Sequence, residues 1–133
     1  MLEFTGERYV PDVTGEIRHE HLHRYGLALG LLAGKDVLDI ACGEGYGSAM
    51  LAAEARSVIG IDNAAKVVAH ARKTYKKSTN LTFEVGDAKA IPLDDQSVDV
   101  VVSFETIEHL AEQDEMLAQI ARVLRPGGLL IIS

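Results

Sequence analysis

The sequence is poor in cysteine, with Cys42 alone among its 133 residues. One cysteine cannot form a disulfide within the chain, which excludes a disulfide-stapled secreted domain and favours a reducing compartment. No apolar run approaches the roughly 18 residues that a membrane helix needs. The first residues also lack the basic and apolar regions of a signal peptide. We therefore expect a cytoplasmic protein that makes no membrane contact.

Basic residues are also scarce, because 13 Lys and Arg face 20 Asp and Glu and give a formal net charge of −7. An acidic surface argues against binding to a phosphate backbone as the main role. A local basic cluster at Arg72, Lys73, Lys76 and Lys77 is interpreted as a solvated helix face. We expect no nucleic-acid partner.

The length of the chain predicts one domain, 1–133, and its hydrophobic content of 47% is sufficient for a core. Residues 1–34 form an N-terminal segment with a helical pattern, and residues 35–133 alternate between short apolar strands and helices. This alternation is typical of an α/β fold, a doubly wound parallel sheet with helices on both faces. The expected strands are 36–41, 57–61, 81–85, 98–104 and 129–133, and the expected helices after residue 35 are 46–55, 64–77 and 114–124.

The last of these strands is strongly apolar, with the sequence Leu129-Leu130-Ile131-Ile132. A free strand edge of this kind invites pairing with another strand. We therefore expect either that the sequence is a fragment of a longer protein or that a partner covers this edge, as in a homodimer.

A glycine-rich turn follows the first strand of this pattern. The strand ends in Asp39, and Gly43 and Gly45 follow, where a backbone without side chains can approach a ligand closely. The next helix start offers free N–H groups. Asp62 ends the second strand, where its carboxylate can accept two hydrogen bonds from a ribose diol. Taken alone, Asp62 is more typical of a helix N-cap, but with the turn it predicts a small-molecule cradle.

Two more strand ends belong to the same crevice. Asp87 follows the third strand and can receive the exocyclic amino group of a base, although it can equally be a turn residue. Phe104 and Glu105 end the fourth strand, beside the expected topological switch point.

Two cofactors suit this layout. A nicotinamide dinucleotide usually requires G-x-G-x-x-G, and here Ser48 occupies the place of the third glycine. S-adenosylmethionine carries a sulfonium and no phosphate, and it tolerates a carboxylate at a strand end, so that Asp39 can lie near its amino group.

The chain resembles the class I S-adenosylmethionine-dependent methyltransferases, in the branch of type 11 methyltransferase domains, over roughly residues 35–133. The stretches that carry this resemblance are Val37–Gly47, Gly60-Ile61-Asp62-Asn63, Gly86-Asp87-Ala88 with Ile91-Pro92, and Asp99–Leu110 with Arg122–Gly128. The resemblance implies an enzyme with a Rossmann-like fold, a sheet ordered 3-2-1-4-5, S-adenosylmethionine as cofactor and S-adenosylhomocysteine as product.

The resemblance also implies the roles of individual residues. Asp39 and the backbone of Ala41, Cys42, Gly43 and Gly45 hold the methionine end; Asp62 binds the ribose with Asn63 beside it; Asp87 and Ala88 bind the adenine; Phe104 and Glu105 flank the reactive end. Ala41 replaces the first glycine of the family pattern, which is tolerable if its backbone φ stays negative. Members of the family usually continue into two more strands.

The acceptor is expected to be a small molecule, such as a sugar, a lipid precursor or a secondary metabolite. Enzymes of this fold that methylate amino groups of nucleic acids typically carry a Pro-Pro-aromatic motif after the fourth strand, where this chain has Ser103-Phe104-Glu105-Thr106. Cytosine C5 methylation needs a cysteine nucleophile, and Cys42 is instead interpreted as a small buried residue of the turn. A general base is needed only if the acceptor must lose a proton. His109, Glu108 and Glu105 are the candidates.

The N-terminal helix leaves two further hypotheses. His19 and His23 have the i, i+4 spacing of metal ligands, but a solvated helix face is preferred and no metal is expected. If this helix packs over the cofactor, His23, Arg24 or Tyr25 can reach the carboxylate of the cofactor.

Two alternative functions stay open. The first is a module or fragment that binds S-adenosylmethionine or S-adenosylhomocysteine without catalytic activity. The second is an NAD-dependent oxidoreductase.

Overall fold

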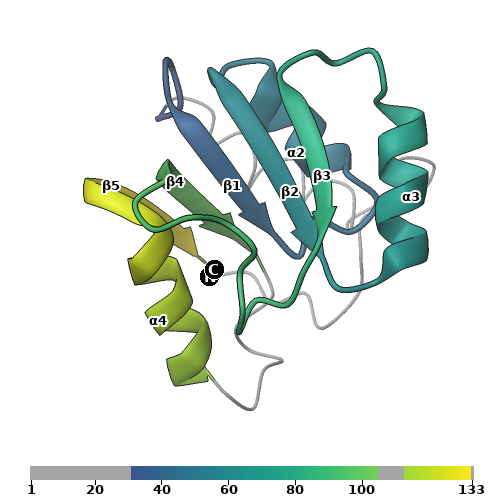
Figure 1. Cartoon of the computed structure of the whole chain (residues 1–133). Coiled ribbons are helices and arrows are strands. Elements are labelled where there is room, and N and C mark those ends of the chain that lie inside the picture. The colour runs from purple at the N-terminus through teal and green to yellow at the C-terminus, as the bar shows by residue number, and fades with distance from the viewer. Residues whose placement is uncertain (1–30, 105–112, 133) are drawn as a thin grey trace, which may run out of the picture.

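The computed structural model describes residues 31–104 and 113–132 of the chain (Figure 1). The elements in these two ranges are β1 (Asp36–Ile40), α2 (Tyr46–Ala52), β2 (Ser57–Asp62), α3 (Ala65–Thr74), β3 (Leu81–Val85), β4 (Val98–Ser103), α4 (Gln113–Val123) and β5 (Leu124–Ile132). The strands form one sheet in the order β3-β2-β1-β4-β5, and every neighbouring pair is parallel. The predicted fold class and strand order are confirmed.

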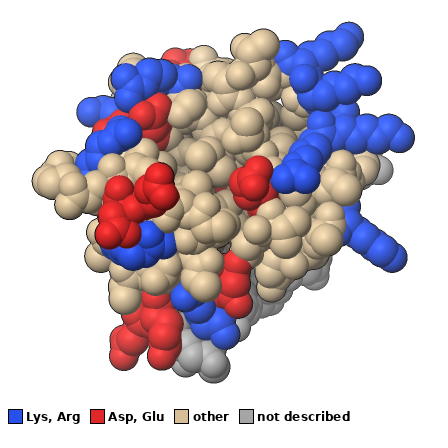
Figure 2. All heavy atoms as spheres, in the orientation of Figure 1, with Lys and Arg blue, Asp and Glu red and all other residues tan. Residues whose placement is uncertain are grey.

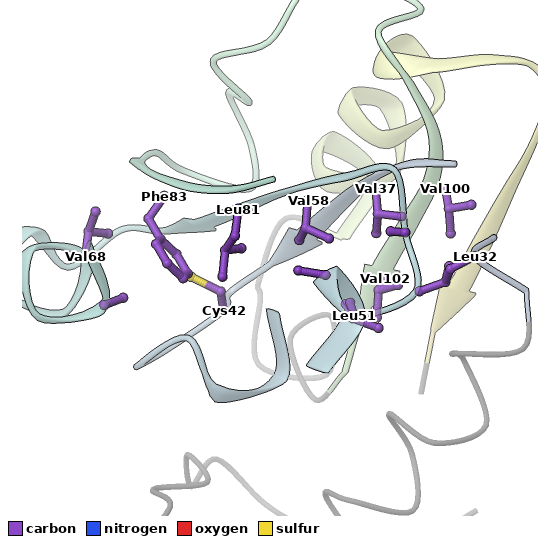
Figure 3. Packing of buried hydrophobic residues seen from close by; sticks show 13 residues of the cluster. Leu32, Val37, Cys42, Leu51, Val58, Val68, Leu81, Phe83, Val100 and Val102 are labelled. Atoms are coloured by element: carbon purple, nitrogen blue, oxygen red, sulfur yellow. The ribbon is translucent and has the colours of Figure 1, made fainter. Parts of the chain in front are cut away.

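Helices cover both faces of the sheet (Figure 1). On β1, Val37 packs on one face in a cluster with Leu51 of α2 and Val68 of α3 (Figure 3). The neighbouring Leu38 points to the other face, in a cluster with Met116 of α4. Because successive side chains of a strand alternate between faces, a sheet that is buried on both sides needs apolar residues at consecutive positions. Burying each of these side chains contributes about 1.5–3 kcal/mol.

The parallel register brings the carboxyl ends of the first three strands to one edge. Ile40 of β1 lies opposite Ile61 of β2, and Asp62 of β2 lies opposite Val85 of β3. The loops that leave these strands therefore start side by side, and the pocket described below forms among them.

The helix α2 is shorter than predicted, because it ends at Ala52 rather than at residue 55. The side chain of Asn80, just before β3, explains this end. Its amide nitrogen donates to the carbonyl oxygens of Ala52 and Ala55, at 2.8 and 3.2 Å. Two carbonyls at the helix end are thus satisfied from outside the helix, and the chain turns into β2.

The strand β5 differs most from the prediction, which ended the last helix at residue 124 and began the last strand at Leu129. In the structure Leu124 already pairs with Val98, and the register then shifts so that Leu129 pairs with Val100. Residues 125–128 form an irregularity in the ladder, at which Gly127 has a φ of +79°. Such bulges accommodate proline and glycine within a strand.

Basic side chains cluster on one part of the described surface. Figure 2 shows Lys and Arg side chains gathered on the side of α3. Arg72, Lys73, Lys76 and Lys77 are all exposed, as predicted, but only Arg72 and Lys73 lie on the helix, because α3 ends at Thr74. Among the residues that the structure describes, no helix is both long and apolar enough to cross a membrane.

Candidate functional site

A pocket lies where β1 and β2 end, beside the turn that follows β3. Its lining residues are Ile40, Ala41, Ile61, Asp62, Asn63, Gly86, Asp87 and Ala88. Five of these were predicted as binding residues: Asp62 and Asp87 from their positions at the strand ends, and Ala41, Asn63 and Ala88 from the family resemblance. Ile40, Ile61 and Gly86 were missed. The signal for the two isoleucines was available, because each precedes a predicted site residue at the end of its strand.

Asp62 ties two loops together at the centre of this site. Its Oδ2 accepts a hydrogen bond from the backbone N–H of Gly43, and its Oδ1 accepts one from the N–H of Ala64, each at 3.0 Å. The residue is only 5% exposed, yet it lines the pocket. Since each oxygen of a carboxylate has two lone pairs, each can still accept a hydrogen bond from a ligand hydroxyl. The local capping role and a ribose-binding role are therefore compatible.

Asp39 lies beneath the pocket and does not belong to its lining. It is 1% exposed, and its Oδ2 accepts a hydrogen bond from the hydroxyl of Ser48 in α2 at 2.7 Å. Gly60 is the neighbour of Asp39 on β2 and leaves room for the Ser48 hydroxyl, because a Cβ at Gly60 would lie only 2.8 Å from Ser48 Oγ. A buried carboxylate must be hydrogen-bonded. In this structure Asp39 fastens α2 to the sheet directly below the glycine turn.

The glycine turn owes its shape to three residues in the left-handed region. Ala41, Gly43 and Gly45 have φ values of +58°, +56° and +91°. At Gly45 a side chain is also excluded by packing, because a Cβ would lie 2.8 Å from the Phe83 ring. The condition under which the alanine would be free of strain, a negative φ at Ala41, is therefore not met. A methyl group in this region costs about 1–2 kcal/mol.

The remaining residues of the turn support it from below. Cys42 is 7% exposed and packs in the core cluster with Phe83 (Figure 3), as predicted for a small buried residue. Its N–H donates to the carbonyl of Ile61 at 2.9 Å. Cys42, Gly43 and Gly45 thus shape the pocket without belonging to its lining.

Asp87 combines the turn role with a position in the pocket. Its Oδ1 accepts from the N–H of Lys89 at 2.8 Å, and its carbonyl accepts from the N–H of Ala90 at 2.9 Å. The preceding Gly86 donates its N–H to the carbonyl of Asp62 at 3.0 Å. Two acidic residues, Asp62 and Asp87, therefore line one pocket, and its lining contains neither Lys nor Arg. Such a site suits a ligand rich in hydroxyl and amino donors.

Comparison with known proteins assigns the family. The family model described as a methyltransferase domain matches residues 38–132. The chain belongs to this methyltransferase family. This methyltransferase domain is 43% identical, over 136 residues, to a probable S-adenosylmethionine-dependent methyltransferase of Mycolicibacterium smegmatis, and the match covers 99% of this chain and 51% of that protein.

Further relatives of this methyltransferase domain are also named as methyltransferases. A probable S-adenosylmethionine-dependent methyltransferase of Mycobacterium tuberculosis is 40% identical, over 100% of this chain and 48% of its own length. The 27-O-demethylrifamycin SV methyltransferase of Amycolatopsis mediterranei is 39% identical, over 78% of this chain and 40% of its own. The chain thus spans about half the length of these two curated relatives from Mycolicibacterium and Mycobacterium.

Solved structures share the fold. The PH0226 protein of Pyrococcus horikoshii has a TM-score of 0.80 and 29% identity, over 90% of this chain and 58% of its own. Phosphoethanolamine N-methyltransferase 1 of Haemonchus contortus, solved with phosphoethanolamine and S-adenosylhomocysteine, has a TM-score of 0.74 and 26% identity, over 86% of this chain and 26% of its own.

Several predicted residues of this methyltransferase domain are not part of the pocket lining. Phe104 is partly buried and packs against the core cluster on the α2 and α3 face. The other predictions concern Arg24, Tyr25, Glu105, Glu108, His109 and the pair His19 and His23, all of which lie outside the described residues. Within the described ranges, no cluster of three or more His, Cys, Asp or Glu could hold a metal ion.

Proposed function

We propose that this methyltransferase domain binds S-adenosylmethionine in the described pocket and catalyses methyl transfer to a small-molecule acceptor, such as a sugar, a lipid precursor or a secondary metabolite. The observation that carries the proposal is the pair of acidic residues, Asp62 and Asp87, that line one pocket at neighbouring strand ends. The names of the relatives support it, since one acts on a rifamycin and one structure holds phosphoethanolamine. The proposal includes the cytoplasm as compartment, with which a single buried cysteine agrees.

The residues of the pocket fit the cofactor by their chemistry. In the proposal Asp62 accepts hydrogen bonds from the ribose hydroxyls with Asn63 beside it, while Asp87 and the Ala88 N–H bind the adenine. The glycine turn from Ala41 to Gly45, supported by Asp39 below it, holds the methionine end. Each of these groups is an acceptor or a backbone donor, as a ligand with two hydroxyls and amino groups requires.

The bound cofactor supplies an electrophilic methyl group, and the chain supplies alignment. The carboxyl edge of the sheet fixes the ribose and adenine, so that the reactive end has a defined position relative to an acceptor. Where the acceptor is a hydroxyl group, a side chain must take its proton. His109, Glu108 and Glu105 remain the proposed candidates, and Phe104 and Glu105 the residues proposed beside the reactive end.

The two alternative functions, an NAD-dependent oxidoreductase and a module that only binds the cofactor, each differ from the proposal in what they require of the site. A nicotinamide dinucleotide brings two phosphate charges, which are disfavoured by a lining with two carboxylates and no cationic side chain. A module that only binds the cofactor would use the same pocket but would lack an acceptor site. Binding measurements address the first alternative, and activity measurements address the second.

The first experiment is calorimetric titration of the purified protein with S-adenosylhomocysteine and, separately, with NAD. We expect the former to bind and the latter not to bind. In the Asp87→Asn variant the side-chain oxygen can still accept from Lys89 N–H, but the new NH₂ group faces a donor of the adenine. The affinity should fall about tenfold, which corresponds to about 1.4 kcal/mol.

The matched control is Asp94→Asn, because Asp94 is exposed in the same loop and is not part of the pocket lining. This variant should bind like the wild type. Binding of NAD without S-adenosylhomocysteine, or an unchanged affinity in Asp87→Asn, would contradict the proposal. Methyl transfer to any member of a panel of sugars, lipid precursors and secondary metabolites would then distinguish an enzyme from a binding module.

A further inference from the structure

We propose that Arg122, near the end of α4, is a positioning residue that holds the part of the pocket formed by Gly86, Asp87 and Ala88. The connection runs through residues 91–95, which we call the β3–β4 loop. The inference rests on the proposed function only where cofactor affinity is the readout, because the contact itself is a property of the fold.

The guanidinium of Arg122 binds this loop at several points. Its Nη1 donates to the carbonyl of Leu93 and to Asp95 Oδ1, both at 2.8 Å. Its Nη2 donates to the carbonyl of Ile91 at 2.7 Å and to Gln119 Oε1 at 2.9 Å. One side chain of α4 therefore binds two backbone carbonyls of the loop in a partly buried setting. The carbonyl of Ile91 also accepts a hydrogen bond from the N–H of Leu93 at 2.9 Å, within the loop itself.

Gln119, three residues earlier on α4, completes the contact. Its Oε1 accepts from the N–H of Ile91 at 3.0 Å, so α4 binds both the N–H and the carbonyl of this residue. Beyond the loop, the N–H groups of Gln96 and Ser97 donate to the carbonyls of Arg122 and Val123, at 2.9 and 2.8 Å. The last turn of α4 thus fixes the chain from Ile91 to Ser97.

The same loop supports the pocket. Ile91 is 3% exposed and belongs to the core cluster on the α4 face, against which Ala88 packs. Pro92 fits over Gly86 so closely that a Cβ there would lie 2.7 Å from Pro92 Cδ. Displacing Ile91 and Pro92 would therefore shift Gly86 and Ala88, two residues of the pocket lining. Because close-packed interiors transmit such shifts, the position of the loop determines the shape of the pocket.

The ion pair between Arg122 and Asp95 is a minor part of this contact. The side chain of Asp95 is 75% exposed, and exposed pairs contribute little. The backbone carbonyls matter more, and the planar fork of arginine reaches several acceptors at once, which the single ammonium of lysine cannot reproduce. Arg122→Lys should therefore behave nearly like Arg122→Ala, whereas Asp95→Asn should behave like the wild type.

The experiment compares Arg122→Ala, Arg122→Lys and Asp95→Asn with Ile120→Val. The last variant loses a buried methyl group on the same helix and keeps Arg122 and Gln119, so it controls for general destabilisation. Amide hydrogen exchange of residues 87–93 is measured without ligand, and affinity for S-adenosylhomocysteine is measured by calorimetry. Should Arg122→Ala fail to fold, Gln119→Ala replaces it, because it removes the acceptor of Ile91 N–H.

We expect both Arg122 variants to exchange about tenfold faster at residues 87–93 and to bind about tenfold more weakly, with Asp95→Asn and Ile120→Val within twofold of the wild type. Arg122 variants that match Ile120→Val in both measurements would overturn the inference. Loss of binding in the wild type would overturn the proposed function instead, and the exchange data would still decide the role of Arg122.

Discussion

At the scale of single residues, Ala41 is the position where the chain tolerates strain. It occupies the left-handed region with a φ of +58°, in a turn whose other two positive-φ residues are glycines. Its exposed methyl group belongs to the pocket lining, so the strain is located at the proposed cofactor site. Backbone strain of this kind persists where the surrounding structure enforces it.

Replacing Ala41 with glycine should stabilise the protein. Glycine removes about 1–2 kcal/mol of strain, because it adopts the left-handed conformation without a clash. It also lowers the stability by about 0.4–1 kcal/mol, because glycine makes the unfolded chain more flexible. We expect a net gain of roughly 0.5–1 kcal/mol in the free energy of unfolding, measured by urea denaturation. Ala69→Gly is the control, since it lies exposed within α3, where glycine costs about 1 kcal/mol. A loss of stability in Ala41→Gly would contradict this account of the turn.

At the scale of elements, an ion network joins the strands at the edge opposite the pocket. Asp36, the first residue of β1, accepts from Arg56 Nε at 2.9 Å and from Arg125 Nη1 at 3.1 Å. Arg125 also pairs with Asp99 of β4 at 3.1 Å, and Asp99 accepts from the backbone N–H of Asp36. Arg125 lies in the irregular part of β5 and Asp99 lies between the two residues of β4 where the register shifts, so the network joins the strands at this irregularity.

The network shifts the pKa values of its acids. The hydrogen bond from Arg56 above all, with those from Ser57 and Arg125, holds the pKa of Asp36 well below its usual range. The hydrogen bond from the Asp36 N–H, followed by that from Arg125, lowers the pKa of Asp99. For both acids the pKa is lower in the folded protein than in the unfolded chain, where it is about 3.9. The ionised carboxylates therefore stabilise the folded state at pH values above about 3.9, and this stabilisation is lost as the pH falls towards the lower, folded-state pKa.

We therefore expect the free energy of unfolding to fall steeply between about pH 5 and pH 2 in the wild type. Asp36→Asn should lose about 1–2 kcal/mol at pH 7, because charge-assisted hydrogen bonds disappear, and its stability should depend less on pH in this range. Glu54→Gln, at an exposed residue, should keep the pH profile of the wild type. Denaturation series at several pH values check this, and equal slopes in wild type and Asp36→Asn would refute it.

At the scale of the whole molecule, β5 forms an open edge of the described sheet. Leu129 and Ile132 of this strand are 41% and 40% exposed. The two mycobacterial relatives are about twice as long as this chain. An edge of this kind therefore has two natural occupants, further strands of a longer chain or a second copy. The division into an N-terminal segment, 1–34, and a core, 35–133, within one domain stays a prediction.

For the 133-residue chain studied alone we predict a homodimer formed through β5. Sedimentation should show a species whose mass rises towards twice 14.4 kDa with increasing concentration. Ile132→Lys should shift the protein to the monomer, because a charged side chain opposes edge pairing. Ala53→Lys, at an exposed residue after α2, is the control and should not change the association. A wild-type monomer at high concentration would contradict the prediction.

The sequence by itself determined the architecture and the outline of the pocket. Strands with consecutive apolar residues, such as Val37 and Leu38, must be buried on both faces, and this requires helices on either side of a parallel sheet. Because parallel strands end at a common edge, Asp62 and Asp87 could be placed in one pocket from their positions in the pattern alone. These inferences depend only on periodicity and on local turn chemistry.

Only the tertiary structure decided which of these acids face the pocket and what holds the loops in place. Asp39 and Asp62 look alike in sequence, but packing buries Asp39 against Ser48 and leaves Asp62 in the lining. The contacts of Arg122 with the β3–β4 loop span about 30 residues of sequence and have no local signature. Side-chain direction at a strand end and long-range hydrogen bonds depend on the packed neighbours, which the sequence pattern does not specify.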